Sequence, residues 1–170
     1  MSAHSPAKFL LVPAFLFCTA SAWAQQPPAN FQVTPYGPPI SVETAKKAAA
    51  AALGEARRNN WLMAVAVVDP SGNLVYYEKM DNTQLGSARV SVEKARSAAL
   101  FKRPTKAFQD AVAGGGAGLR VLGLDGAVPL EGGVPLIVDG KIIGAIGLSG
   151  DTSEHDAQCA KAGAEAAAKP

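Results

Sequence analysis

The sequence predicts an α+β fold in which helices pack on an antiparallel sheet of five strands. Apolar residues recur at intervals of three and four in an alanine-rich segment that begins near Ser41, as in a helix with one buried face. Short apolar runs alternate with turn residues, and Asp139-Gly140 between two of these runs is the strongest hairpin signal in the chain. Strands joined by hairpins are antiparallel, so the helices are expected to cover an antiparallel sheet.

Two long helices are expected in the first half of the domain. One begins after Ser41, a good N-cap residue, and extends to about Asn59, while the other extends from about Ser87 to Phe101. Small side chains are expected to form their buried faces: Val42, Ala45, Ala49, Ala52, Leu53 and Ala56 in the first, and Ala88, Val92, Ala95 and Ala99 in the second. Whatever covers these faces must therefore approach closely.

Two further helices are expected. Thr105 can cap a short helix that extends to about Val112, because Pro104 ends the helix before it. A last helix begins at Thr152 or Ser153, where Ser153 and Asp156 have the spacing of a capping box, and extends to about residue 169.

The five strands are expected at residues 62–68, 74–79, 127–130, 134–138 and 141–148. The first run is continuously apolar, which is typical of a strand covered on both faces. The glycine-rich segment 114–118 lacks the spacing of a dinucleotide-binding loop, because Leu119 stands where the last glycine should be. We interpret this segment as a flexible connector or a place where another backbone packs closely.

The N-terminal 24 residues have the features of a secretory signal peptide. They contain no acidic residue, one lysine (Lys8), an apolar run at 9–17 and a small-residue cleavage site after Ala24. Residues 25–39 form a proline-rich lead-in, and residues 40–170 form one domain. The protein is therefore expected to be exported, either periplasmic or secreted, and no other segment has the length of a membrane span.

Removing residues 1–24 leaves His155 and Cys159 as the only histidine and cysteine. This count excludes an internal disulfide and the usual zinc sites built from four cysteines and histidines of one chain. The loss of Lys8 leaves 15 basic residues against 14 acidic ones. A balance this close to neutral does not indicate nucleic-acid binding.

Three groups of residues are candidates for a site. His155 and Cys159 lie four residues apart on one helix face, where His155 could ligate a metal or haem iron or could simply be a surface histidine above a buried cysteine. Lys102 and Arg103, near Lys94 in the sequence, could bind a carboxylate or phosphate or could form a solvated turn.

The third group is Glu131-Gly132-Gly133, which either forms a strand bulge or lines a pocket where only backbone fits.

Four segments together resemble the GlcG/HbpS family of haem-binding proteins, which is also similar to the C-terminal domain of PduO-type adenosyltransferases. They are AVAVVDPSGNL at 64–74, KARSAALFKRPT at 94–105, EGGVPL at 131–136 and GAIGLSG at 144–150, and the resemblance covers about residues 40–168. It implies a profilin-like five-stranded antiparallel sheet flanked by helices, assembly into homo-oligomers, and haem as the cofactor, with roles in haem sensing, storage or redox protection.

The resemblance also implies where haem would lie. We expect it against the helix that carries Lys94, with Lys102 and Arg103 facing the propionates and either His155 or the hydroxyl of Thr105 approaching the iron. Glu131, Gly132 and Gly133 would complete the site.

Two other functions stay open. The protein could bind or transform an organic acid, an aldehyde or another small anionic ligand in the same pocket, near Glu131 and Arg103. It could also be an assembly scaffold without a ligand. No nucleophile motif is present and no catalytic residue is assigned, so the sequence favours a binding protein over an enzyme and leaves catalysis open.

Overall fold

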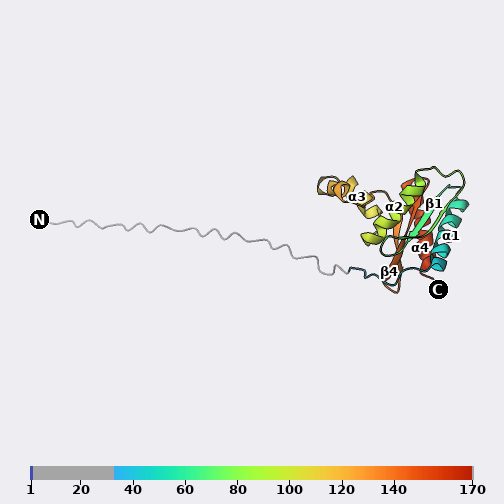
Figure 1. Ribbon diagram of the computed structural model, residues 1–170. Coiled ribbons are helices and arrows are strands. Elements are labelled where there is room, and N and C mark those ends of the chain that lie inside the picture. The colour runs from blue at the N-terminus through green and yellow to red at the C-terminus, as the bar shows by residue number, and fades with distance from the viewer. Residues whose placement is uncertain (2–32, 170) are drawn as a thin grey trace. The chain divides into compact units, whose positions relative to one another are not determined.

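The structure, a computed structural model, describes Met1 and residues 33–169. The expected signal peptide and the first part of the proline-rich lead-in lie outside the described residues. Within the described part, the helices and strands belong to a single compact unit (Figure 1).

The sheet has four antiparallel strands in the order β2-β1-β4-β3. They are β1 (Ala64–Val68), β2 (Leu74–Lys79), β3 (Gly133–Val138) and β4 (Lys141–Ser149). The expected fifth strand at 127–130 is wrong. Ala127 closes a turn by donating to the carbonyl of Leu124, and the N–H of Val128 donates to Ser97 Oγ of the neighbouring helix. The segment therefore packs on a helix and adds no strand to the sheet.

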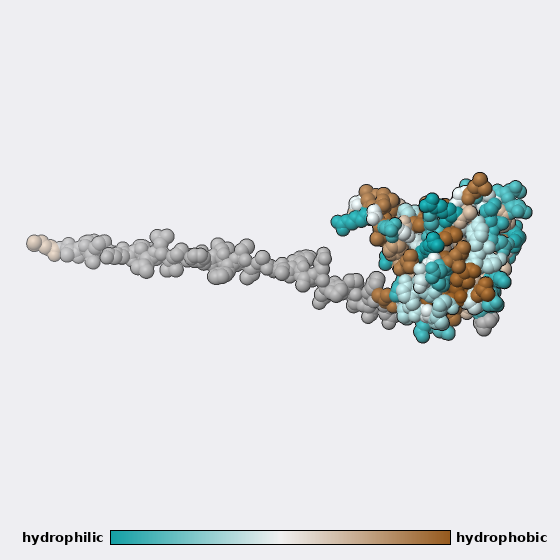
Figure 2. Space-filling model, in the orientation of Figure 1, coloured by the Kyte–Doolittle hydropathy of each residue, from teal (hydrophilic) through white to brown (hydrophobic). Residues whose placement is uncertain are grey.

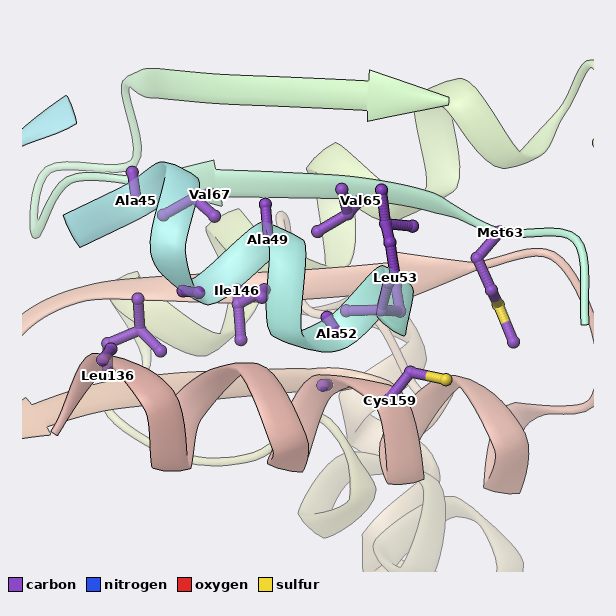
Figure 3. Packing of buried hydrophobic residues seen from close by; sticks show 14 of the residues in the cluster. Ala45, Ala49, Ala52, Leu53, Met63, Val65, Val67, Leu136, Ile146 and Cys159 are labelled. Carbon is purple, nitrogen blue, oxygen red and sulfur yellow. The ribbon is translucent and has the colours of Figure 1, made fainter. Parts of the chain in front are cut away.

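Helices cover both faces of this sheet (Figure 1). They are α1 (Val42–Arg58), α2 (Ser87–Leu100), α3 (Lys106–Ala113), the 3₁₀ helix η1 (Gly116–Gly123) and α4 (Ser153–Ala167). α1 and α4 pack on one face around the larger apolar cluster, which Figure 3 shows between these helices and the strands. α2 packs on the other face, against a smaller cluster that includes Ala66, Ala95 and Ala145.

Alanine on α1 allows α4 to approach it closely, as the sequence predicts. Ser41 caps α1 by accepting a hydrogen bond of 3.1 Å from the N–H of Thr44. A Cβ atom added to Gly163 of α4 would lie 2.8 Å from the carbonyl oxygen of Ala48, so the two helix backbones nearly touch. The predicted face is wrong at its first residue, because Val42 is 40% exposed, and Ala48 is buried instead.

The hairpin predictions are confirmed. Every residue of β1 is buried, as expected for a strand covered on both faces. Asp139 and Gly140 connect β3 and β4 with φ angles of 48° and 71°, which are the left-handed values that a type I′ turn requires. Before α1, Tyr36 forms a short parallel bridge with Ile142, so the end of the lead-in pairs with β4 beyond the end of β1.

The inward face of α2 differs from the prediction. Ala95 and Ala99 are buried, but Ala88 and Val92 are only half-buried. The positions that point fully inward also include one charged residue, Lys94, and three serines at 87, 91 and 97. Helical spacing identified which side of α2 faces the sheet. It missed the lysine and the serines on that side, because a search for apolar periodicity counts only apolar residues.

The glycine-rich segment is also more ordered than a flexible connector. Gly116 to Gly118 begin η1, and a Cβ atom on Gly118 would lie 1.9 Å from the carbonyl oxygen of Ala111. Close backbone packing, the second of the two interpretations, is therefore the one that holds. In the part of the chain that the structure describes, no helix combines the length and apolar character that a membrane crossing needs.

Candidate functional site

Five of the predicted site residues meet in one place, which we call the buried junction. Lys94 of α2, Thr105 before α3, and Glu131, Gly132 and Gly133 at the entrance of β3 come together there. The junction also contains Asp156 of α4, which sequence reasoning considered only as a helix-capping residue. The sequence could not predict that Asp156 pairs with Lys94, because 62 residues separate the two.

An ion pair forms the centre of the buried junction. Lys94 Nζ lies 2.6 Å from Asp156 Oδ2, and the two side chains are only 2% and 3% exposed. Burial raises the pKa of Asp156, although the charge and hydrogen bond of Lys94 oppose this shift. The second carboxylate oxygen of Asp156 accepts the N–H of Asp151 at 3.4 Å. The pair is thus enclosed and satisfied within the protein.

The two glycines of the junction are required by this packing. Gly132 has a φ of 123°, and a Cβ atom there would lie 2.7 Å from Asp156 Cβ and 2.9 Å from Lys94 Nζ. A Cβ atom on Gly133 would lie 2.3 Å from the carbonyl oxygen of Lys94. Glycine here lets the backbone contact α2 directly.

Thr105 is a structural link and not the predicted helix cap. Its own φ and ψ are helical, and its side chain forms no capping hydrogen bond with α3. Instead the fully buried hydroxyl accepts the N–H of Gly133 at 2.9 Å, while the Thr105 N–H donates to the Gly133 carbonyl at 3.0 Å. This hydroxyl is therefore engaged inside the fold.

Glu131 lies at the rim of the buried junction. Its carboxylate is 4.0 Å from Lys106 Nζ, and its N–H donates to Gln109 Oε1 at 2.8 Å. Lys106 also pairs with Asp110 at 2.7 Å. The rim is thus a small network of surface charges.

Lys102 and Arg103 contact neither the junction ion pair nor His155. Lys102 Nζ donates to the carbonyl of Thr34 at 3.1 Å and lies 4.0 Å above the ring of Tyr36. Arg103 donates from Nε to the carbonyl of Phe101 and stacks over Phe108 at 5.6 Å. Lys102 holds the end of the lead-in in place, while Arg103 covers an aromatic ring.

His155 lies in the first turn of α4 and belongs to a second cluster. Its ring stacks on Trp61, with 3.8 Å between centroids and 13° between planes. Its Nδ1 lies 2.7 Å from Asp151 Oδ1, and the side chain is 37% exposed. We call Trp61, Asp151 and His155 the His155 triad. Trp61 was missed by sequence reasoning, since nothing in the sequence relates the loop that follows α1 to the start of α4.

Cys159 does not share the chemistry of His155. The thiol is buried, and burial raises its pKa to about 12, with the nearby charge of Glu55 acting in the same direction. A thiol that resists ionisation is a poor metal ligand. Among residues 33–169, no group of three or more histidine, cysteine, aspartate or glutamate side chains could hold a metal ion.

The His155 triad leaves one ring nitrogen available. The N–H of Thr152 and the contact with His155 both lower the pKa of Asp151, so this side chain is a carboxylate that accepts hydrogen bonds. A neutral imidazole that donates from Nδ1 has its lone pair on Nε2. No hydrogen-bond partner of Nε2 occurs in the described part of the chain. This is the arrangement of a metal-ligating histidine with its orienting carboxylate.

Residues 40–165 match the model of a family described as haem-degrading HbpS-like proteins. The chain belongs to this HbpS-like family. Protein GlcG of Escherichia coli K12 is 44% identical over 110 residues, which are 65% of this chain and 81% of GlcG. The resemblance expected from the four sequence segments is confirmed.

Solved structures of similar proteins have the same fold. A crystal structure of a PduOC–haem complex superposes with a TM-score of 0.68 and 28% identity, covering 75% of this chain and 94% of that chain. A double mutant of HbpS from Streptomyces reticuli superposes with a TM-score of 0.69 and 28% identity, covering 84% and 96% of the two chains.

Proposed function

We propose that this protein binds haem. The observation that carries the proposal is the shared fold with PduOC, a protein whose crystal structure is that of a haem complex, over 94% of the PduOC chain. The description of the family as haem-degrading HbpS-like proteins points to the same ligand. Within this chain, His155 offers what haem iron needs from a protein, an imidazole whose Nε2 has no hydrogen-bond partner among the described residues.

His155 is the residue best suited to be the axial ligand. Thr105, the other residue considered for the iron, has its hydroxyl bound to Gly133 inside the fold. Lys94 is likewise enclosed with Asp156 and has no surface from which to contact a ligand.

The surface near His155 has the mixed character that haem requires. Leu62 follows Trp61 and is exposed, and its carbonyl oxygen packs against Gly150, which immediately precedes Asp151. Leu62 also lines a neighbouring hollow of about 410 Å³, whose other lining residues are Met80, two bases (Arg57 and Lys79) and two acids (Glu78 and Asp81). His155 itself does not line this hollow. Leu62 and Met80 can contact the edge of a porphyrin ring, and Lys79 can pair with a propionate, whereas Arg57 is already paired with Glu78 at 3.5 Å.

Titration with haemin tests both parts of the proposal. Micromolar haemin should give a Soret band shifted from that of free haemin, with one haem per chain. His155→Ala should lose the spectrum of an imidazole ligand, whereas Glu165→Ala, an exposed change on the same helix, should match the wild type. Absence of a Soret shift in the wild type would refute haem binding.

We infer that the protein acts after export, because residues 1–24 have the composition of a signal peptide. Expression in a bacterial host followed by N-terminal sequencing of the exported protein tests this inference. The chain should begin at Gln25. Recovery of an intact Met1 end from the cytoplasmic fraction alone would contradict it.

We also propose that the chain forms homo-oligomers through an apolar arm, residues 106–123. Within the described chain α3 and η1 pack mainly on each other, and Phe108 is their one buried residue. Leucines are exposed on and beside this arm: Leu119, Leu122 and Leu124 along it, and Leu100 and Leu130 at its base. Figure 2 shows apolar surface on the arm at the upper left.

A second copy of this chain fits the arm better than a charged partner does. Arg120 is the only charged residue between positions 111 and 124, so the surface offers little to a nucleic acid or an acidic protein. A symmetric contact would bury the leucines of both copies at once. Each leucine removed from water contributes up to about 1.5–3 kcal/mol.

Sedimentation or light scattering measures the assembly. The wild type should be oligomeric, and Leu122→Glu at the 65% exposed position should dissociate it, whereas Leu85→Glu at an 86% exposed position outside the arm should not. A monomeric wild type at tens of micromolar protein would refute the interface.

A further inference from the structure

The His155 triad contacts its histidine at two places, the ring face and Nδ1. We propose that Asp151 and Trp61 position His155 as a strongly electron-donating iron ligand, so that bound haem is held preferentially in the ferric state. This inference rests on the proposed haem binding, and it assigns positioning roles to two residues that would not touch the iron.

Asp151 is itself fixed in place. Its Oδ1 accepts the N–H of Thr152 at 2.7 Å and contacts His155 Nδ1 at 2.7 Å. Thr152 in turn caps α4 by accepting the N–H of His155 at 3.3 Å. The carboxylate and the imidazole therefore belong to the same helix start, and the carboxylate cannot rotate away without losing its hydrogen bond from the Thr152 N–H.

The contact with a carboxylate changes the chemistry of the ring. A hydrogen bond from Nδ1–H fixes the tautomer, so the lone pair stays on Nε2. The negative charge of Asp151 also draws the Nδ1 proton and makes Nε2 a more basic ligand. A more basic nitrogen stabilises Fe(III) more than Fe(II), because the higher charge on the metal gains more from electron donation.

Trp61 fixes the plane of the ring. Its indole stacks nearly parallel to the imidazole, and its backbone N–H donates to the carbonyl of Ala56 at 2.9 Å just after α1. The Trp61 side chain also packs against the larger apolar cluster. The imidazole thus has a rigid wall on one face and an anchored carboxylate at Nδ1, which together determine the direction of Nε2.

The arrangement can be tested without haem. Long-range ¹H–¹⁵N NMR spectra of the unliganded protein should show neutral His155 protonated on Nδ1. Asp151→Ala should shift the population toward the Nε2–H tautomer, while Asp139→Ala, in the distant β3–β4 turn, should not. A wild-type His155 that is protonated mainly on Nε2 would overturn the proposal before any ligand is added.

The haem-loaded protein gives the second readout. Asp151→Asn should weaken haemin binding about 10–100-fold, make the ferric/ferrous midpoint potential less negative and lower the iron–histidine stretching frequency of the ferrous form. Asp139→Asn makes the same chemical change outside the triad and should leave all three unchanged. Trp61→Ala should weaken haemin binding, and Trp61→Phe, which retains a stacking ring, should restore most of it.

The outcomes separate this inference from the proposed function. If the wild type binds no haemin, haem binding itself is refuted. If it binds haemin and His155→Ala is unchanged, haem binding stands and the triad is overturned. If His155 ligates the iron but Asp151→Asn leaves affinity and potential at wild-type values, the positioning role of Asp151 is overturned.

Discussion

Replacing Lys94 by methionine should expose how much the fold depends on its buried ion pair. The change keeps a long flexible side chain but leaves Asp156, only 3% exposed, without its cation. Breaking a buried pair from one side costs about 3–5 kcal/mol, because the remaining charge is neither solvated nor paired. In a domain whose total stability is of the order of 5–15 kcal/mol, this loss should be obvious in urea unfolding.

The cost should depend on pH in a defined direction. Burial raises the pKa of Asp156 in the folded state, and removal of Lys94 takes away the charge that opposes this shift. A carboxyl whose folded pKa lies above its unfolded value, about 3.9, stabilises the fold when protonated, and this contribution is lost as the pH rises through the folded pKa. Lys94→Met should therefore lie closest to the wild type near pH 4 and furthest from it near pH 7.

A double variant completes the test. Lys94→Met combined with Asp156→Leu removes both charges and should recover at least half of the lost free energy of unfolding. Lys161→Met, at an exposed lysine of α4, should change it by less than about 0.5 kcal/mol. The reasoning fails if Lys94→Met costs less than about 1 kcal/mol at pH 7, or if the double variant is no more stable than the single one.

Three further changes should each destabilise the fold, as measured by urea unfolding. Gly132→Ala should cost about 2–4 kcal/mol, because φ is 123° and no space exists for a Cβ atom, and a cost under about 1 kcal/mol would contradict this packing. Thr105→Val should cost about 1–3 kcal/mol by leaving the Gly133 N–H without an acceptor, whereas Thr105→Ser should cost less. Burial acts to raise the pKa of Asp69, but hydrogen bonds from Asn73 and its neighbours lower it on balance. The Asp69 carboxylate therefore stabilises the fold above about pH 3.9 and loses this effect as pH falls through the lowered pKa, so Asp69→Ala should cost about 1–2 kcal/mol at pH 7 and less near pH 2.

Local sequence signals predicted most of the secondary structure. Ser41 identified the start of α1, and Asp139-Gly140 identified the β3–β4 turn, because caps and turns depend on side chains within a few residues. The failure at 127–130 has the opposite cause. A short apolar run can pack at a sheet edge or against a helix. Here the segment packs against α2, where the N–H of Val128 donates to Ser97 Oγ.

The sequence predicted which residues of the candidate site lie together better than it predicted what they do. Lys94, Thr105 and the two glycines at 132 and 133 do come together, yet they form a closed structural junction. Their partner Asp156 looked like a capping residue, because only the packing of both α4 and α2 against β3 brings it to Lys94. His155 was recognised as a lone histidine, but its chemistry depends on Trp61, which lies just beyond the end of α1.

The sequence by itself determined the balanced charge and, apart from the expected strand at 127–130, the order of helices and strands, since these follow from residue types and their spacing. The resemblance of four segments identified the family. Only the tertiary structure decided which polar side chains are enclosed and which stay available to a ligand. A lysine on a helix gives no local sign of its burial, because burial depends on a carboxylate 62 residues away that compensates its charge. The same holds for His155, whose free Nε2 is defined by two neighbours from different parts of the fold.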